Sequence, residues 1–397
     1  MAVKTQQLDT LINSVRSLEP LIREHADEAE QNRRLSQPVV AAFAEAGLFR
    51  MFVPHRLGGL EVAPLTLYRI VEEVARIDGS TGWVLMIGAT TAAVGAYVSD
   101  KAAAEIFGTN PLGITGGALF PPGKAIVSEG GYLASGRWPY ASGCQHCTWL
   151  FGLCNAFEGD EMRLTPEGDP EVRAVFVPVS QATILDTWEV SGLAGTGSHD
   201  FTLEQIFVPE EYSWRFGAGM KPQGQHYQGP LYQFPFLGLF PLAIAPVGLG
   251  IAQGAVDASL ELAQAKRPAA STVLLRDQSL FQVRMAEAVA LVRSARAWLY
   301  AATQRMWEAT ISREPATFEA RADLLLAAAN VTRSAAAAVD IVYTAAGGTA
   351  NYRRSPLQRA LRDVHAVTQH LATAPQQFEN AGRMLLGQQP LLPMILL

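Results

Sequence analysis

The sequence has 397 residues, of which 49% are hydrophobic and 17% charged, a composition that is typical of a globular protein and excludes collagen-like and wholly disordered chains. The length allows two or three domains. Thirty-one Lys and Arg residues against 37 Asp and Glu residues give a net charge of −6, so the chain lacks the basic field that captures nucleic acids.

The first part of the chain, residues 1–118, predicts a domain of helices. Apolar residues recur at helical spacing near the N-terminus, and the stretch 65–77 predicts a further helix. Ser80 and Thr81 stand where side chains commonly cap the helix that follows.

Residues 119–218 predict a small β domain, because short β-branched or aromatic runs alternate there with turn residues. From 219 to 397 the chain returns to Ala- and Leu-rich sequence, which predicts long helices packed as a bundle. The predicted fold class is therefore α+β, in three parts.

Two long uncharged stretches, 79–99 and 227–256, have the length of membrane spans. Acidic residues flank the first on both sides, and four prolines interrupt the second. We therefore expect both to be buried core, with no membrane partner. The N-terminus lacks the layout of a signal peptide, which favours a cytoplasmic protein.

The three cysteines, Cys144, Cys147 and Cys154, are too few and too close together for a disulfide framework. With His146 they suggest half of a zinc site, but the second half is missing from the sequence. Buried thiols are therefore the preferred interpretation, and no metal is expected.

The run GTGSHD at 195–200 leads into a strand pattern rather than a helix, which excludes a dinucleotide-binding fingerprint. We interpret it as a tight turn in which Ser198 and Asp200 bind their own backbone. The aromatic-rich stretch 226–241 is compatible with either a pocket lining or a core.

Five further segments occur in a characteristic order and at characteristic separations. They are EAGLFRMFVPHRLGGLEV (45–62), VARIDGSTGWV (74–84), SGRWPYASGCQHCTW (135–149), SGLAGTGSHDFTLEQIFVPE (191–210) and GGTANYRRSPLQRALRDVHAVTQH (347–370). Together with the three-part order, they resemble the acyl-CoA dehydrogenase fold over nearly the whole chain. Within that fold, the chain is most similar to the two-component flavin-dependent monooxygenases.

This resemblance implies an N-terminal helical domain, a central β-sandwich or barrel and a C-terminal four-helix bundle. It also implies a reduced flavin, FADH2 or FMNH2, with O2 as co-substrate. A separate NAD(P)H:flavin reductase would be the partner, and the bundle would form the centre of a homotetramer. The sequence carries no nicotinamide-binding motif of its own.

In the dehydrogenases, a Gly-x-Lys-x-Trp-Ile-Thr-like run places an aromatic residue against the isoalloxazine and a hydroxyl at flavin N5. Laid on this chain from Gly136, that run puts Tyr140 at the aromatic position and Ser142 at the hydroxyl position. A reduced flavin needs an acceptor for its N5–H and a flat apolar neighbour. The alternative for Ser142 is a turn serine before Gly143.

The dehydrogenases also need a carboxylate base, which in most of them follows an Arg-Asp pair by about two helical turns. The equivalent positions here are His370 and Leu371, and 227–256 contains no Asp or Glu. By resemblance, His370 takes the place of the monooxygenase histidine beside the oxygen adduct, where it would shuttle a proton. The alternative is a paired core histidine. His365 and His370 are expected on one helix, five residues apart, so they should face about 140° away from each other.

Arg276 resembles the arginine that reaches a neighbouring subunit's flavin phosphates, and Gly347 and Gly348 resemble the end of the adenosine clamp. The Gln of that clamp is Thr344 here, so both FMN and FAD stay open. Relatives that act on phenols carry a substrate-deprotonating His in the helical domain. Residues 79–100 contain none, which argues against phenol hydroxylation.

The resemblance thus implies the oxygenase component of a flavin-dependent monooxygenase, which forms a C4a-hydroperoxide in a dry pocket and inserts one oxygen atom into an apolar, aromatic small molecule. The alternatives are an acyl-CoA dehydrogenase-type FAD enzyme, an N- or S-oxygenase of the same fold, and a non-catalytic helical scaffold. The identity of the substrate stays open.

Overall fold

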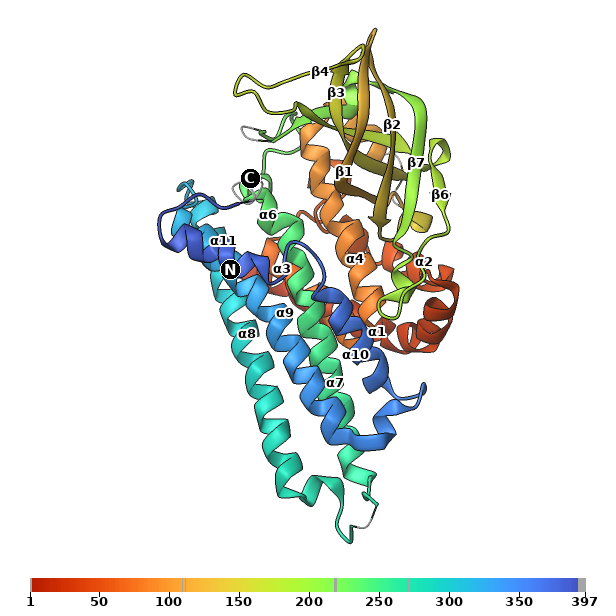
Figure 1. Cartoon of the computed structure of the whole chain (residues 1–397), viewed down its shortest axis with the longest axis vertical. Coiled ribbons are helices and arrows are strands. Elements are labelled where there is room, and N and C mark those ends of the chain that lie inside the picture. Colours follow the sequence, from red (N-terminus) through yellow and green to blue (C-terminus); the bar gives the residue numbers. More distant parts are fainter. Residues whose placement is uncertain (1, 109, 111, 218–219, 270, 392–397) are drawn as a thin grey trace.

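The computed structural model describes residues 2–108, 110, 112–217, 220–269 and 271–391. Helices from the two ends of the chain lie beside a sheet that the middle part forms (Figure 1). The first strand begins at Thr115 and the last ends at Phe216. The predicted α+β class is confirmed, whereas the domain limits at 118 and 218 stay predictions.

The N-terminal part consists of α1 (Ala2–Asn32), α2 (Gln37–Glu45), α3 (Pro64–Ile77), α4 (Gly79–Thr91) and α5 (Asp100–Ala103). Helix α4 is apolar on all sides because it packs against α3, the sheet and the C-terminal helices at once. Its cap is Asp78, whose carboxylate accepts hydrogen bonds from the Thr81 amide and hydroxyl at 2.8 and 2.7 Å. The prediction that Ser80 or Thr81 caps this helix is wrong, because Thr81 donates to the cap.

The middle part forms one mixed sheet with the strand order β6-β7-β2-β1-β3-β5-β8, and β4 also pairs with β3. Strands β1 and β3 run parallel, and the other paired strands are antiparallel. The expected sandwich or barrel thus takes the form of one continuous sheet. Its strands are β1 (Thr115–Ser128), β2 (Gly131–Ala141), β3 (Trp149–Glu158), β4 (Glu161–Met162), β5 (Val172–Pro178), β6 (Thr183–Leu185), β7 (His199–Pro209) and β8 (Ser213–Phe216).

The C-terminal part is the predicted helical bundle. Helices α7, α8 and α9 are long rods lying side by side, and α10 packs against α7 and α9 (Figure 1). Helix α11 packs against α9, and α3 of the N-terminal part packs against α7. The bounds are α6 (Phe236–Leu239), α7 (Ala245–Ala265), α8 (Ser279–Ile311), α9 (Phe318–Ala346), α10 (Pro356–Val367) and α11 (Gln376–Leu385).

Two segments, Leu242–Ala265 and Phe318–Asn351, are long and apolar enough to cross a membrane by length and composition alone. Both are core helices here, because 78% and 67% of their most apolar windows are buried inside the molecule. The first overlaps the uncharged stretch 227–256, and the stretch 79–99 forms the buried α4 and the 3-10 turn after it.

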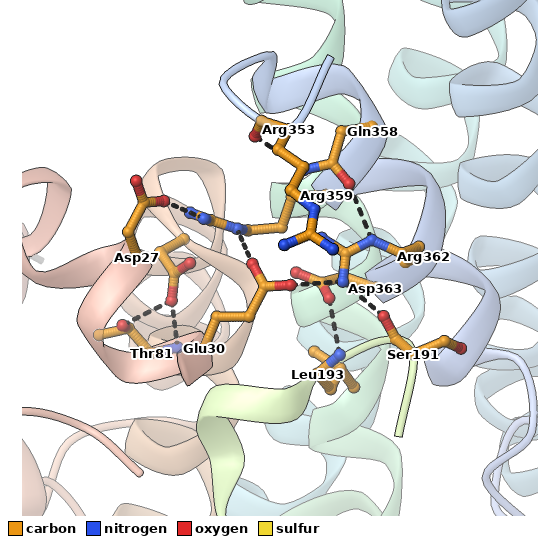
Figure 2. A network of polar contacts seen from close by, with 11 residues as sticks. Asp27, Glu30, Thr81, Ser191, Leu193, Arg353, Gln358, Arg359, Arg362 and Asp363 are labelled. Atoms are coloured by element: carbon orange, nitrogen blue, oxygen red, sulfur yellow. Dashed lines mark hydrogen bonds and ion pairs between the residues drawn. The ribbon is translucent and has the colours of Figure 1, made fainter. Parts of the chain in front are cut away.

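An ionic network joins α10 to the N-terminal helices. Arg359 pairs with Asp27 and Glu30 of α1 (Figure 2). Arg362 also pairs with Glu30, at 2.6 Å, and donates to the Ser191 carbonyl. The network therefore holds α1, α10 and the segment before β7 together.

The same segment touches α10 directly. Asp363 accepts a hydrogen bond from the Leu193 amide at 2.6 Å (Figure 2). At Gly192 a Cβ would lie 2.1 Å from the Arg362 carbonyl oxygen, so only glycine permits this approach. Residues 191–193 are thus held in one position against α10.

Candidate active site

All three parts of the chain contribute to one cavity of about 1090 Å³. Its walls come from α4, the start of β1, the end of β2, the segment 188–198, and the C-terminal helices, including the turn after α10. Most lining side chains are apolar, among them Met86, Phe240 and Leu325. This volume and lining suit a large, mainly apolar organic ligand.

Ser142 is buried in the cavity wall directly after β2. Its Oγ accepts a hydrogen bond from Trp83 Nε1 at 2.9 Å and lies 2.7 Å from Ser198 Oγ. Ser198 Oγ lies 2.7 Å from Thr196 Oγ1, which donates to the Leu193 carbonyl at 2.8 Å. The Ser142 hydroxyl therefore belongs to a buried chain of hydrogen bonds, which we call the hydroxyl chain, in addition to standing in a turn.

Tyr140 lies at the mouth of the cavity and is 70% exposed. The register of β2 against β7 shifts between Trp138 and Ala141, and Tyr140 has a φ of 62°, which is rare for an aromatic residue. Its ring meets the edge of Trp188, with ring centres 6.1 Å apart. This bulge turns Tyr140 out of the sheet, where it stands beside Trp188 on the cavity wall.

His370 lies beyond the end of α10, because that helix ends at Val367 and a turn follows. The expected 140° separation from His365 is therefore wrong, since it assumed one continuous helix. Both side chains line the cavity. His365 is exposed, and its Nε2 lies 2.9 Å from Asp340 Oδ1.

The His370 imidazole and the Trp83 ring make a T-shaped contact, with ring centres 5.8 Å apart. Its Nδ1 accepts a hydrogen bond from the Ala372 amide at 3.2 Å, which assigns the proton of the neutral ring to Nε2. Burial lowers the pKa of His370 to about 4. At neutral pH the ring is therefore uncharged and has one N–H to donate.

In the described part of the chain, no Asp or Glu lines the cavity. The two positions that correspond to the dehydrogenase base, His370 and Leu371, both line it. Asp363 is buried, and its Oδ1 is occupied by the Leu193 amide. Burial and the nearby Asp78 raise the pKa of Asp363 to about 7. The described walls thus offer two imidazoles and several hydroxyls as hydrogen-bonding groups, without a carboxylate.

The remaining predicted site residues lie elsewhere. Arg276 is in the connection between α7 and α8, where it donates to Gln264 Oε1 at 2.9 Å, and Gly347 and Gly348 directly follow α9. Both segments are at the end of the bundle far from the sheet (Figure 1). None of the three residues lines the cavity.

The cysteines are buried and unpaired. Cys144 Sγ and Cys147 Sγ donate to backbone carbonyls at 3.6 and 3.4 Å, and burial raises the pKa of Cys144 and Cys154 to about 12. Within the ranges that the structure describes, no group of three or more His, Cys, Asp or Glu residues is placed to hold a metal ion.

The tight turn predicted at residues 195–200 is present, since the Gly197 amide donates to the Ala194 carbonyl and the His199 amide to the Gly197 carbonyl. The predicted partners of the Ser198 and Asp200 side chains are wrong. Ser198 binds the side chains of Ser142 and Thr196 rather than its own backbone. Asp200 accepts from Arg137 Nε at 2.7 Å and from Thr187 Oγ1 at 2.9 Å. The local turn pattern concealed most of these contacts because Ser142, Arg137 and Thr187 lie on other segments.

Four wall residues with a part in the site were missed from the sequence: Trp83, Trp188, Thr196 and Ser198. For Thr196 and Ser198 the available signal was two hydroxyl residues, each directly after a glycine, just before a strand. In the aromatic-rich stretch 226–241, Phe240 lines the cavity, whereas Tyr227 and Tyr232 are buried core, so each interpretation holds for part of the stretch.

The walls fit the ring system of a flavin. A flat tricyclic ring needs an extended apolar space, aromatic neighbours and a polar group at N5. The cavity provides the space, Trp188 and Tyr140 at its mouth, and the Ser142 hydroxyl in its wall.

Known proteins resemble this chain over almost its full length. Residues 5–105 match the acyl-CoA dehydrogenase N-terminal domain, and residues 242–375 match the acyl-CoA dehydrogenase C-terminal domain. An indole-3-acetate monooxygenase from Pseudomonas putida is 34% identical over 96% of this chain and 94% of its own length. The oxygenase component of an FADH2-dependent resorcinol hydroxylase from a Rhizobium species is 30% identical over 96% of this chain and 95% of its own.

Among solved structures, XiaF from a Streptomyces species, in complex with FADH2 and glycerol, has a TM-score of 0.91 and 22% identity, with 99% of this chain and 98% of XiaF covered. At this identity the likeness concerns the fold alone. The predicted fold, family and use of reduced flavin are confirmed. The chain therefore belongs to the acyl-CoA dehydrogenase family, as a flavin-dependent monooxygenase that uses reduced flavin and O2.

Proposed function

We propose that this oxygenase component receives reduced flavin from a separate NAD(P)H:flavin reductase and inserts one atom of O2 into an uncharged aromatic small molecule. One observation carries the proposal. The neutral His370 imidazole and the buried Ser142 hydroxyl line an apolar cavity that no carboxylate of the described chain enters. A dehydrogenase would need such a carboxylate as its base.

Each wall residue has a role in this proposal. When bound, a reduced flavin supplies the electrons and the site of oxygen activation. Ser142 holds the N5 edge, and Tyr140 and Trp188 cover the ring. The neutral His370 would donate a hydrogen bond from its Nε2–H toward oxygen. The apolar walls exclude water, which would otherwise divert the reaction to peroxide.

The charges around the cavity support an uncharged substrate. Arg362 is paired with Glu30, and His365 is paired with Asp340. Burial keeps His370 neutral. Among the described lining residues, no cation is therefore left to bind a substrate carboxylate. The names of the Pseudomonas and Rhizobium relatives, which refer to indole-3-acetate and resorcinol, support an aromatic substrate.

The proposal extends to assembly and location. A homotetramer would bring Arg276, Gly347 and Gly348 to the phosphate and adenosine end of a neighbouring subunit's flavin. Their position at the far end of the bundle supports this arrangement. We place the protein in the cytoplasm, where its three free cysteines would stay reduced.

The test begins with anaerobic titration of the protein with reduced FMN and reduced FAD. The complex is then mixed with ¹⁸O2 in the presence of indole or of indole-3-acetate. We expect one labelled oxygen atom in the product from indole and much less product from the carboxylate. Equal turnover of both compounds would contradict the uncharged substrate. Bleaching of bound oxidised FAD by an acyl-CoA would overturn the monooxygenase assignment.

A further inference from the structure

We propose that Ser198 and Thr196 are positioning residues which fix the direction of the Ser142 hydroxyl, so that Ser142 presents an acceptor to flavin N5 and favours the reduced flavin. This inference rests on the flavin site of the proposed function. It assigns a task to two residues whose side chains would otherwise count only as turn hydroxyls.

The two ends of the hydroxyl chain have fixed roles. The indole nitrogen of Trp83 can only donate, and it does so to Ser142 Oγ at 2.9 Å. The Leu193 carbonyl can only accept, and it receives the Thr196 hydroxyl at 2.8 Å. Between these ends lie three hydroxyls with one proton each.

Only one arrangement of the hydroxyl protons places a proton in every hydrogen bond of the hydroxyl chain. Thr196 gives its proton to Leu193, so it must accept from Ser198 at 2.7 Å. Ser198 has then used its proton and must accept from Ser142, also at 2.7 Å. If Ser142 turned its proton elsewhere, one of these short oxygen–oxygen contacts would hold no proton.

The acceptor end of the chain is held firmly. Leu193 has a φ of 53°, in the left-handed region that leucine rarely adopts, and its amide donates to Asp363 on α10 (Figure 2). Its carbonyl also accepts from Trp188 Nε1 and from the Thr196 amide, each at 3.1 Å. This carbonyl is therefore oriented by three donors.

The donor end is equally constrained. Trp83 is buried, and its ring makes a T-shaped contact with the His370 ring. Trp83 therefore always donates and the Leu193 carbonyl always accepts, so the fold sets the direction in which the three hydroxyls donate.

Ser142 consequently has one lone pair left and no free proton. Reduced flavin has a proton on N5 and matches this lone pair, whereas N5 of oxidised flavin is itself an acceptor. N5 of oxidised flavin would therefore face the lone pair of Ser142 Oγ. Otherwise Ser142 would have to turn its proton toward N5 and lose its hydrogen bond to Ser198. One such bond corresponds to roughly a 3- to 10-fold difference in affinity.

The test uses Ser198→Ala, which frees the Ser142 proton directly, and Thr196→Val, which frees the Ser198 proton so that Ser198 can donate to Ser142. Kd values for oxidised and dithionite-reduced flavin are measured anaerobically by fluorescence, together with the midpoint potential of the bound flavin. We expect oxidised flavin to bind roughly 3- to 10-fold more tightly than in the wild type, with the Kd of reduced flavin little changed. The preference for the reduced form should shrink by the same factor.

Two controls accompany these variants. Thr196→Ser keeps the hydroxyl and should keep the wild-type preference. Ser135→Ala removes a hydroxyl from the same strand β2 outside the cavity lining and should change neither affinity. Melting curves show whether each variant folds, and either of the two hydroxyl-deleting variants suffices if the other does not.

A merely structural role would weaken both affinities together and leave their ratio unchanged, which would overturn the proposal. If the wild type bound neither flavin form, the flavin site itself would be wrong. If the wild type prefers reduced flavin and the variants keep the same ratio of the two Kd values, the flavin site stands and only the role of the hydroxyl chain is refuted.

Discussion

The two ends of the molecule differ in how far their proposed site residues are buried. Near the sheet, Ser142, Thr196 and Ser198 are buried and bonded to one another within a single chain. At the far end, Arg276 is exposed, and a Cβ at Gly348 would meet no atom within 4 Å. We infer that the ring-binding end is complete in one chain, whereas the far end has open space for a second copy to complete.

The largest expected effect concerns the cavity end. His370→Ala removes the Nε2–H donor, and we expect product formation to fall by roughly 10²- to 10³-fold, as is typical when one hydrogen-bond donor to developing charge is lost. Binding of reduced flavin should change little, because the proposed contact to N5 comes from Ser142. Single-turnover product formation and flavin titration separate the two quantities.

His365→Ala is the matched control, because His365 also lines the cavity but is exposed and paired with Asp340. It should keep activity within a few-fold of the wild type. Equal losses in the two variants would remove His370 from the chemistry.

The second effect is a difference in pH dependence between a His370 variant and the wild type. Since the pKa of His370 is about 4 in the folded chain and near 6.5 when unfolded, the unfolded chain binds the extra proton between these values. His370 therefore lowers stability as the pH falls from 6.5 towards 4, by roughly 2–3 kcal/mol at pH 4.5. His370→Gln should lose less of its unfolding free energy on acidification than the wild type.

Urea unfolding of both proteins from pH 7.5 to 4.5 measures this difference. Asp363, whose raised pKa acts in the opposite direction, is present in both proteins and cancels. Parallel stability curves would contradict a neutral, desolvated His370.

The third effect isolates the ring-binding contact. Ser142→Ala removes the acceptor for flavin N5 and the partner of Trp83, a loss of ~1–3 kcal/mol. We expect the Kd of reduced flavin to rise and more peroxide to be released per product formed. Ser135→Ala serves as the control. An unchanged ratio of peroxide to product would return Ser142 to the role of a turn serine.

The sequence predicted the helices, the sheet region and the bundle because each has a strong hydrophobic period or a dense turn pattern, as in 65–77 and 119–218. By resemblance rather than periodicity, it assigned Ser142 and His370 to a flavin site. Both side chains line one cavity, and their roles stay predictions. It missed the end of α10 at Val367, since a helical period does not reveal where a terminal turn begins.

The hydroxyl chain was beyond local patterns for a different reason. Trp83 is 59 residues from Ser142 along the chain, and Ser198 is 56 residues away. Turn propensity describes how Ser198 meets its own backbone, and tertiary packing overrode that preference.

The smallest expected effect tests the far end. Arg276→Gln removes one exposed cation, so the Kd of reduced FAD should rise by only roughly 2- to 5-fold, with a weaker effect at high salt. Product formation at saturating flavin should be unchanged, because Arg276 does not line the cavity. Arg284→Gln, an exposed arginine on α8 that pairs with Glu287, makes the same charge change and is the control. If both variants shifted the Kd equally, net charge rather than a phosphate contact would explain the result. A rise in Kd confined to the Arg276 variant, with turnover unchanged, would support the proposed assembly. In that assembly, Arg276 of one copy binds the phosphates of a flavin whose ring lies in the cavity of a neighbouring copy.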